Sequence, residues 1–98
     1  MPELELVIVF PTTHLTLSAE KSLDKAGIKH RTIMKPRRIS SDCGLAIRID
    51  SRSLDICQEA LTEDGLLPVR FFREVEGAWE CVEELVSIEP PDAETRLR

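Results

Sequence analysis

The chain has 98 residues, the size of one domain, and 42% of them are hydrophobic, which argues against disorder over most of its length. No apolar run approaches the roughly 20 residues that a membrane-spanning helix needs, and the acidic start lacks the basic segment of a signal peptide, so we expect a cytoplasmic chain with no membrane association. The net charge of −5 disfavours a nucleic acid as the partner.

The first half of the sequence predicts a strand, a helix and a second strand. Residues 4–10 form an apolar run that is short enough for a buried strand, and Pro11 ends it. Thr12 or Thr13 can cap a helix over residues 14–26, and Gly27 stands where the residue after a helix is commonly glycine. Residues 28–34 read as a second strand with a weaker pattern.

The second half repeats this order after a loop. Residues 35–44 are basic, polar and rich in turn formers, so we expect a loop there. A strand over residues 45–49 follows, then a helix that starts between residues 50 and 53 and ends at Gly65. Residues 68–74 supply a fourth strand, with proline at its first position.

The order β-α-β-β-α-β predicts an α+β fold of the ferredoxin-like kind over residues 1–75, a four-stranded antiparallel sheet with both helices on one face. Right-handed connections then bring the Pro11–His14 turn and the Lys35–Gly44 loop to the same edge of the sheet. Residues 76–98 form a C-terminal extension, in which Ala78 to Val86 has the spacing of a short helix and the charged end is expected to fray.

Charge is segregated along the chain. Residues 29–38 carry five basic side chains and no acid, whereas residues 74–94 carry eight acids and no base. One interpretation is two solvated faces. The other is a basic loop that lies beside a cysteine.

The three cysteines, Cys43, Cys57 and Cys81, are an odd number without Cys-x-x-Cys spacing. A disulfide framework and a structural zinc site are therefore not expected, and we expect neither a metal ion nor a cofactor. Cys57 falls on the apolar face of the second predicted helix and reads as a core residue. Cys81 is either exposed or a partner thiol for Cys43.

Cys43 is the candidate reactive residue, because cationic neighbours and helix N-termini lower the pKa of a thiol. Its loop and the neighbouring turn supply both, together with hydroxyl groups that could hold an anion: His14, Lys35, Arg37, Arg38, Ser40 and Ser41. Gly44 permits a turn that exposes the sulfur, whereas Asp42 opposes the effect. The alternative is that Cys43 only packs at a strand edge.

Three stretches of the sequence resemble a family of short proteins described as selenium or sulfur carrier-like. They are Phe10-Pro11-Thr12-Thr13-His14, then Ala19-Glu20, then Lys35-Pro36-Arg37-Arg38-Ile39-Ser40-Ser41-Asp42-Cys43-Gly44. The similarity spans roughly residues 5–73, and the stretch from Pro36 to Gly44 is its specific part. Lys35 departs from the family pattern, which often has a proline or a small residue there.

The resemblance implies that Cys43 is the cysteine that carries a persulfide or selenopersulfide. It further implies partner proteins that donate and accept the sulfur or selenium. The residues that it places around Cys43 are Thr12, Thr13, His14, Pro36, Arg37, Ser40, Ser41 and Gly44, to which the charge of the loop adds Arg38.

Other functions stay open from the sequence. The same loops could bind a small anion or the acidic surface of a protein in a regulatory module without covalent chemistry, an argument from fold analogy. RNA binding is disfavoured, because the central strands offer only Phe10 for stacking on bases. A homodimer through the helix-free face of the sheet is open too, and the C-terminal extension could cover that face instead.

Overall fold

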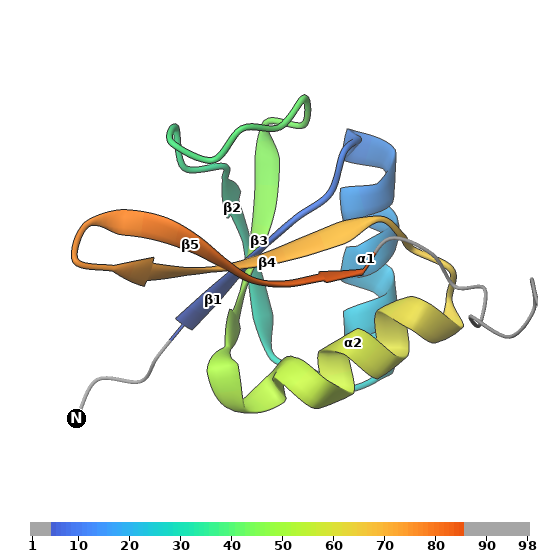
Figure 1. The fold of residues 1–98 in the computed structure, drawn as a ribbon. Coiled ribbons are helices and arrows are strands. Elements are labelled where there is room, and N and C mark those ends of the chain that lie inside the picture. The colour runs from blue at the N-terminus through green and yellow to red at the C-terminus, as the bar shows by residue number, and fades with distance from the viewer. Residues whose placement is uncertain (1–4, 86–98) are drawn as a thin grey trace, which may run out of the picture.

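The computed structural model describes residues 5–85, which form two helices packed on one antiparallel sheet (Figure 1). A single turn of 3-10 helix, Ser51–Ser53, precedes the second α-helix. No helix within the described range is long and apolar enough to cross a membrane. In chain order the elements are β1 (Glu5–Val9), α1 (Thr13–Lys25), β2 (His30–Met34), β3 (Leu45–Asp50), α2 (Leu54–Glu63), β4 (Val69–Val75) and β5 (Ala78–Leu85).

The sheet has five strands in the order β2-β3-β1-β4-β5, and every neighbouring pair is antiparallel. The prediction of four strands was therefore wrong, although the elements up to β4 follow the predicted order. Ile8 pairs with Ile47 in β3, and Val9 pairs with Arg70 in β4. The end of β1 thus lies between the start of β3 and the start of β4, at the edge where the loop of residues 35–44 leaves the sheet.

Local signals set the ends of α1. The Thr12 side chain caps the helix by accepting a hydrogen bond from the backbone N–H of Leu15 at 3.1 Å. Gly27 follows the C-terminal turn with φ of 73°, a left-handed conformation that glycine adopts without steric cost. Of the two predicted capping residues, Thr12 is the one that caps the helix, and Gly27 follows the helix as predicted, although the helix spans Thr13–Lys25 where residues 14–26 were expected.

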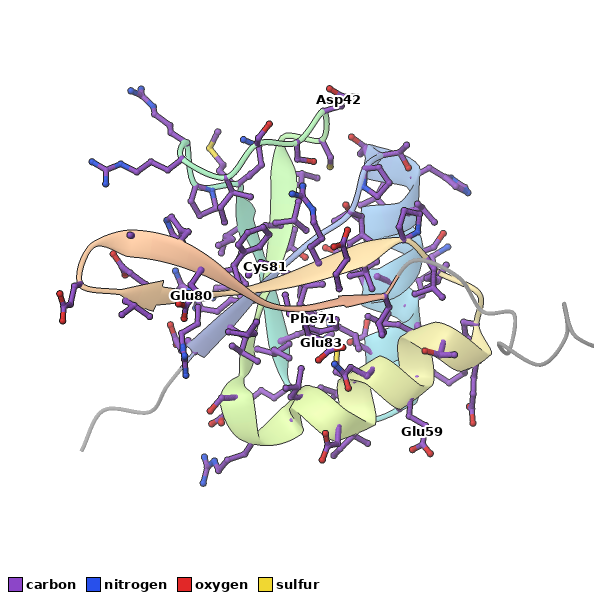
Figure 2. All side chains as sticks on the ribbon, in the orientation of Figure 1. Asp42, Glu59, Phe71, Glu80, Cys81 and Glu83 are labelled. Atoms are coloured by element: carbon purple, nitrogen blue, oxygen red, sulfur yellow. The ribbon has the colours of Figure 1, made fainter. Side chains whose placement is uncertain are left out.

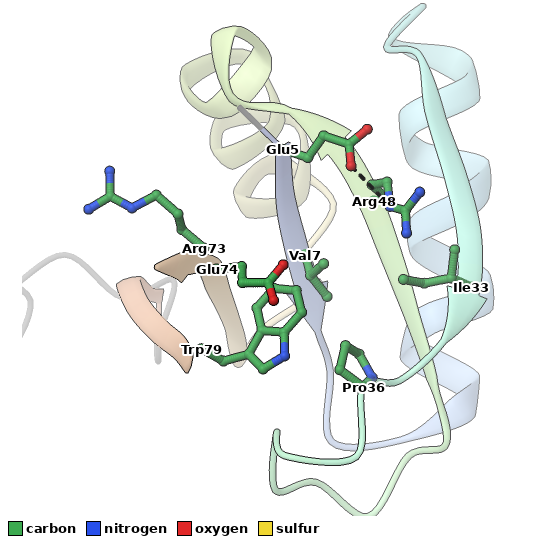
Figure 3. A pocket seen from close by; sticks show the side chains of 8 residues that line it. All are labelled: Glu5, Val7, Ile33, Pro36, Arg48, Arg73, Glu74 and Trp79. Atoms are coloured by element: carbon green, nitrogen blue, oxygen red, sulfur yellow. Dashed lines mark ion pairs between the residues drawn. The ribbon is translucent and has the colours of Figure 1, made fainter. Parts of the chain in front are cut away.

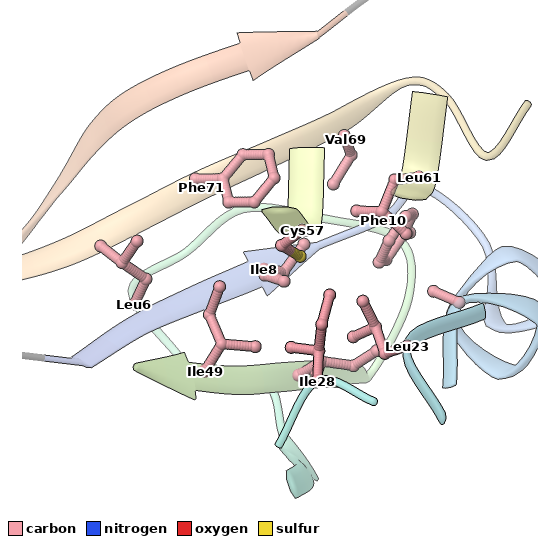
Figure 4. Close-up of a cluster of buried hydrophobic side chains, with 12 residues drawn as sticks. Leu6, Ile8, Phe10, Leu23, Ile28, Ile49, Cys57, Leu61, Val69 and Phe71 are labelled. Carbon is pink, nitrogen blue, oxygen red and sulfur yellow. The ribbon is translucent and has the colours of Figure 1, made fainter. Parts of the chain in front are cut away.

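The main core lies between the sheet and the two helices (Figure 4). Alternate residues of β1 point into it, because successive side chains of a strand face opposite sides of a sheet. Cys57 and Leu61 of α2 are fully buried there, and α1 contributes Leu23. The core role expected for Cys57 is confirmed.

A smaller cluster lies on the helix-free face, the face of the sheet opposite the helices. It contains Val7, Val9 and Phe72, and Ile39 of the loop packs on them with only 2% of its surface exposed. Trp79 of β5 packs against the same cluster. The loop is therefore folded down onto the sheet on this side.

Residues 78–85 form a strand, so the helix predicted from Ala78 to Val86 was wrong; Val86 itself lies outside the described residues. Glu76 and Gly77, with φ of 51° and 83°, form the tight turn between β4 and β5. A register shift opposite Phe71 and Phe72 interrupts the alternation of β5. Figure 2 shows Glu80, Cys81 and Glu83 along this strand, and all three are exposed.

Candidate functional site

The sulfur of Cys43 lies at the start of α1, in the loop that joins β2 to β3. The Sγ atom is 3.3 Å from Thr16 Oγ1 and 3.7 Å from Thr13 Oγ1. The backbone N–H of Leu45 donates to the sulfur at 3.4 Å. Only 2% of the surface of Cys43 is exposed. The two segments expected to meet therefore do meet, and their contact covers the thiol.

This environment favours the thiolate. Burial by itself raises the pKa of Cys43, because it disfavours the charged form. The hydrogen bonds from Thr16, the backbone of Leu45 and Thr13 act in the opposite direction, as does the positive charge of Lys35. Together they outweigh burial, so the pKa of Cys43 is lower than that of an ordinary cysteine.

Each protonation state of the sulfur has hydrogen-bond partners. A thiol can donate to the carbonyl of Leu45, which lies 3.5 Å from Sγ. A thiolate instead accepts from the Leu45 N–H and from the two threonine hydroxyls. The Thr16 hydroxyl also donates to the Thr12 carbonyl at 3.1 Å. A hydroxyl has only one hydrogen to donate. When the sulfur ionises, the Thr16 hydroxyl would therefore turn its hydrogen from the Thr12 carbonyl towards Sγ.

Polar contacts hold the loop in place beside the helix. Ser41 bridges two segments, because its hydroxyl donates to the Phe10 carbonyl at 3.1 Å and accepts from the Cys43 N–H at 3.3 Å. Lys35 closes the base of the loop, where its N–H donates to the Gly44 carbonyl at 2.9 Å. Its ammonium donates to the Ile39 carbonyl at 2.6 Å. Lys35 therefore acts on the sulfur as a nearby charge and not as a direct contact.

The arginines do not surround the sulfur, contrary to the expectation of a positively charged shell. Arg38 donates to the Gly77 carbonyl at 3.0 Å, in the turn between β4 and β5. Arg37 is exposed and makes no hydrogen bond or ion pair with any residue between 5 and 85. The chain reverses direction sharply in this loop, and that carries the two side chains towards β5 and solvent.

The remaining predicted site residues do not contact the Cys43 sulfur with their side chains. Thr12 acts through the helix cap, and Ser40 accepts through its carbonyl from Arg70 at 2.6 Å. Pro36 lines a cavity of about 320 Å³ on the helix-free face, beside Val7 and Trp79 (Figure 3). His14 is exposed, and its side chain makes no hydrogen bond or ion pair within the described part of the chain. Gly44 is exposed next to the sulfur.

The other two cysteines differ from Cys43, and all three are free thiols. Burial in the core raises the pKa of Cys57 to about 12, so this thiol stays protonated and unreactive in the folded chain. Cys81 is exposed on β5, and its thiol donates to the Glu83 carbonyl at 3.6 Å. Among residues 5–85 no group of histidine, cysteine and acidic side chains has the arrangement of a metal site.

Sequence reasoning missed two of the groups that contact the sulfur. Thr16 is fully buried, although threonine is usually exposed, and it lies one turn after the cap on the helix face that turns inward. A polar residue at that position was a usable signal for a buried partner. The backbone of Leu45 carried no signal, because any residue type supplies an N–H and a carbonyl.

Comparisons with known proteins give one match. The sequence profile of a family described as "Putative Se/S carrier protein-like" matches residues 5–73, which include β1, the cysteine loop and the first residues of β4. No curated protein and no solved structure matches the chain. The matched region covers more than half of the sequence, so the chain belongs to this Se/S carrier protein-like family.

Proposed function

We propose that the chain carries sulfur or selenium on Cys43 between partner proteins. The observation that supports this most directly is the set of three groups around the sulfur that can donate hydrogen bonds to its anion, the Leu45 N–H and two threonine hydroxyls, although the side chain is buried. A cysteine that serves only packing needs no such donors. Cys57, with a pKa raised to about 12, is the example in this same chain.

The transfer step conserves atoms and charge. The Cys43 thiolate attacks the outer sulfur of a donor persulfide, R–S–SH, and forms a new S–S bond. The S–S bond of the donor breaks, and its inner sulfur leaves as the thiolate R–S⁻. Cys43 then holds the –S–SH group, and an acceptor thiolate removes the outer sulfur by the same step in reverse. A selenopersulfide donor, R–S–SeH, would pass on selenium in the same way.

The donors that favour the thiolate would also act during transfer. When the acceptor takes the outer atom, Cys43 leaves as a thiolate, and the hydroxyls of Thr13 and Thr16 stabilise that leaving group. The positive end of the α1 dipole adds to this effect. Thr12 contributes through the cap, since it fixes the first turn of the helix that presents both hydroxyls.

The proposal extends to fold type, location and partners. We assign the elements from β1 to β4 to the ferredoxin-like arrangement, with β5 as an addition at the β4 edge. The family name supports partner proteins that give and receive the carried atom. The proposed place of transfer is the cytoplasm, where thiols are kept reduced.

Persulfide loading tests the proposal. The purified chain is incubated with a cysteine desulfurase and free cysteine, and its thiols are then alkylated. The mass of each cysteine-containing peptide is measured by mass spectrometry after digestion. We expect one added sulfur atom on the Cys43 peptide, and we expect none in Cys43→Ala. The matched control Cys81→Ser retains full loading. Equal loading of the wild type and Cys43→Ala, or loading confined to Cys81, would refute the carrier function.

A further inference from the structure

Cys43 is buried, although a carrier needs its sulfur to be accessible to other proteins. Only 2% of the residue is exposed, yet a donor or acceptor must approach the sulfur to within bonding distance. The loop of residues 35–44 or the start of α1 must therefore move. The contacts that hold the loop closed determine how often this happens.

Arg70 of β4 makes one of these contacts from outside the loop. It lies opposite Val9 in the sheet, so its side chain starts at the edge where the loop crosses. Its guanidinium donates to the Ser40 carbonyl at 2.6 Å and stacks on the Phe72 ring, 5.2 Å from the ring centre. The ring fixes the direction of the guanidinium, and the short hydrogen bond then fixes the loop backbone three residues before Cys43.

Two further contacts join the loop to the β4–β5 hairpin. Arg38 donates to the carbonyl of Gly77 at the tip of the hairpin, at 3.0 Å. Ile39 is buried in the cluster on the helix-free face, against which Trp79 of β5 also packs. The residues from 38 to 40 are thus each tied to β4, β5 or the turn between them.

The next residues connect this anchor to the sulfur. Ser41 is bonded to the Phe10 carbonyl and to the N–H of Cys43, and Cys43 contacts α1. Between Arg38 and Cys43 only Asp42 makes no polar contact with the rest of residues 5–85, and Figure 2 shows it at the tip of the loop. Contacts along residues 38–43 therefore connect the β4–β5 hairpin to the sulfur almost continuously.

We propose that Arg70 and Arg38 are positioning residues that keep the cysteine loop closed, so that release of the loop from the β4–β5 hairpin exposes the sulfur for transfer. This inference rests on the proposed carrier function for its purpose. The closed loop itself is a property of the folded chain, and a reaction that involves no persulfide can measure it.

The three free cysteines allow this measurement in one molecule. Iodoacetamide is added to the folded chain, and the modification of each cysteine is followed by mass spectrometry at early times. Cys81 is exposed and reports the intrinsic rate of the reagent, whereas Cys57 is buried in the core and reports global unfolding. Cys43 reports opening of the loop.

We expect Arg70→Ala and Arg38→Ala each to raise the rate at Cys43 by about threefold to tenfold, the effect of losing one hydrogen bond. The rate at Cys57 stays unchanged. Arg70→Lys retains a donor and gives a smaller increase than Arg70→Ala. Arg73→Ala is the matched control, because Arg73 also links β4 to β5, through Glu80 at 3.1 Å, but does not reach the loop.

Two outcomes would overturn the inference. One is an unchanged rate at Cys43 in both arginine variants. The other is a rise at Cys43 that is matched at Cys57, or equalled by Arg73→Ala, since either would mean that the whole fold or the whole hairpin had loosened. If the alkylation rates are as expected but the chain takes up no persulfide, the inference of a closed loop stands and the proposed carrier function is refuted.

Discussion

Replacement of Thr16 by valine is a direct test of what the site does to the sulfur. Valine has nearly the same shape as threonine and the same branching at Cβ, so it fills the buried position without a cavity. The substitution removes the hydroxyl that lies 3.3 Å from Cys43 Sγ. The Thr12 carbonyl, which accepts from that hydroxyl, keeps the Thr16 N–H as a donor at 3.2 Å. The change therefore falls mainly on the sulfur.

The magnitude follows from the strength of a hydrogen bond to a charged group, about 1.5–3 kcal/mol. We take the lower end, because the Thr16 hydroxyl must give up the Thr12 carbonyl before it can donate to the thiolate. Loss of about 1.5 kcal/mol lowers the thiolate population roughly tenfold at any pH well below the pKa. The substitution thus raises the pKa of Cys43.

The assay is the rate of alkylation of Cys43 as a function of pH, with Cys81 in the same molecule as the reference. Below the pKa we expect Thr16→Val to react about tenfold more slowly than the wild type. At a pH high enough to ionise Cys43 fully in both proteins, the two rates converge. Thr13→Val gives a smaller shift, because its hydroxyl lies farther from the sulfur, at 3.7 Å.

Two results would refute this reasoning. Superimposed pH profiles for the wild type and Thr16→Val would show that the hydroxyl does not stabilise the thiolate. A rate that falls by the same factor at every pH would show that the substitution changes access to the sulfur and leaves its pKa alone.

Three further predictions concern stability, each measured by urea unfolding under reducing conditions. The pKa of Cys57 is about 12 in the folded chain, against 9.0 for a free thiol, so the unfolded chain loses this proton first. The free energy of unfolding should therefore fall by about 1.4 kcal/mol per pH unit above pH 9. This pH dependence should be absent from Cys57→Ala. Gly77→Ala should cost about 1–2 kcal/mol, because φ is 83°, whereas Gly44→Ala, whose added methyl group meets nothing within 4 Å, changes stability by less than about 0.5 kcal/mol. Ile39→Ala should cost about 2–4 kcal/mol, and the control Ile56→Ala far less, because Ile56 is 52% exposed. Equal effects within either control pair, or an unaltered alkaline slope in Cys57→Ala, would contradict the corresponding prediction.

Much of the fold could be predicted because its local signals agree with its packing. The apolar run that ends at Pro11, the threonine cap and Gly27 each specify one boundary, and all three stand where the sequence placed them. Antiparallel pairing then follows from the order of the elements. Little long-range information is needed for this part of the chain.

Strand β5 was mistaken for a helix for an identifiable reason. Trp79, Val82 and Leu85 are spaced by three, as on one face of a helix. In the structure the register shift in β5 interrupts its alternation. Trp79 packs on the helix-free face, and the other two pack on the main core. Gly77 was the available signal, since glycine is favoured at the second position of a two-residue hairpin turn; Glu76 was a weak one, because Asn, Asp or Gly is usual before that glycine.

The site was predictable in its location but not in its contacts. The topology placed the start of α1 beside Cys43, and charge counting then suggested an arginine shell. Of the two arginines expected there, Arg38 binds the backbone carbonyl of Gly77 and Arg37 is exposed, whereas the Ser40 carbonyl is bound by Arg70, which was not predicted. A carbonyl is present at every residue, so the sequence does not distinguish the one that an arginine will find.

The last strand also determines how the sheet ends. The outer side of β5 is unpaired within residues 5–85, and a bare strand of this kind is a template on which a second chain can add. Glu80, Glu83 and Glu84 are exposed on this strand, and Glu76 is exposed in the preceding turn. Arg73 pairs with Glu80, and the other glutamates leave the border with an excess of negative charge. Two such acidic borders repel each other, so their charge opposes the pairing of β5 with the β5 strand of a second chain.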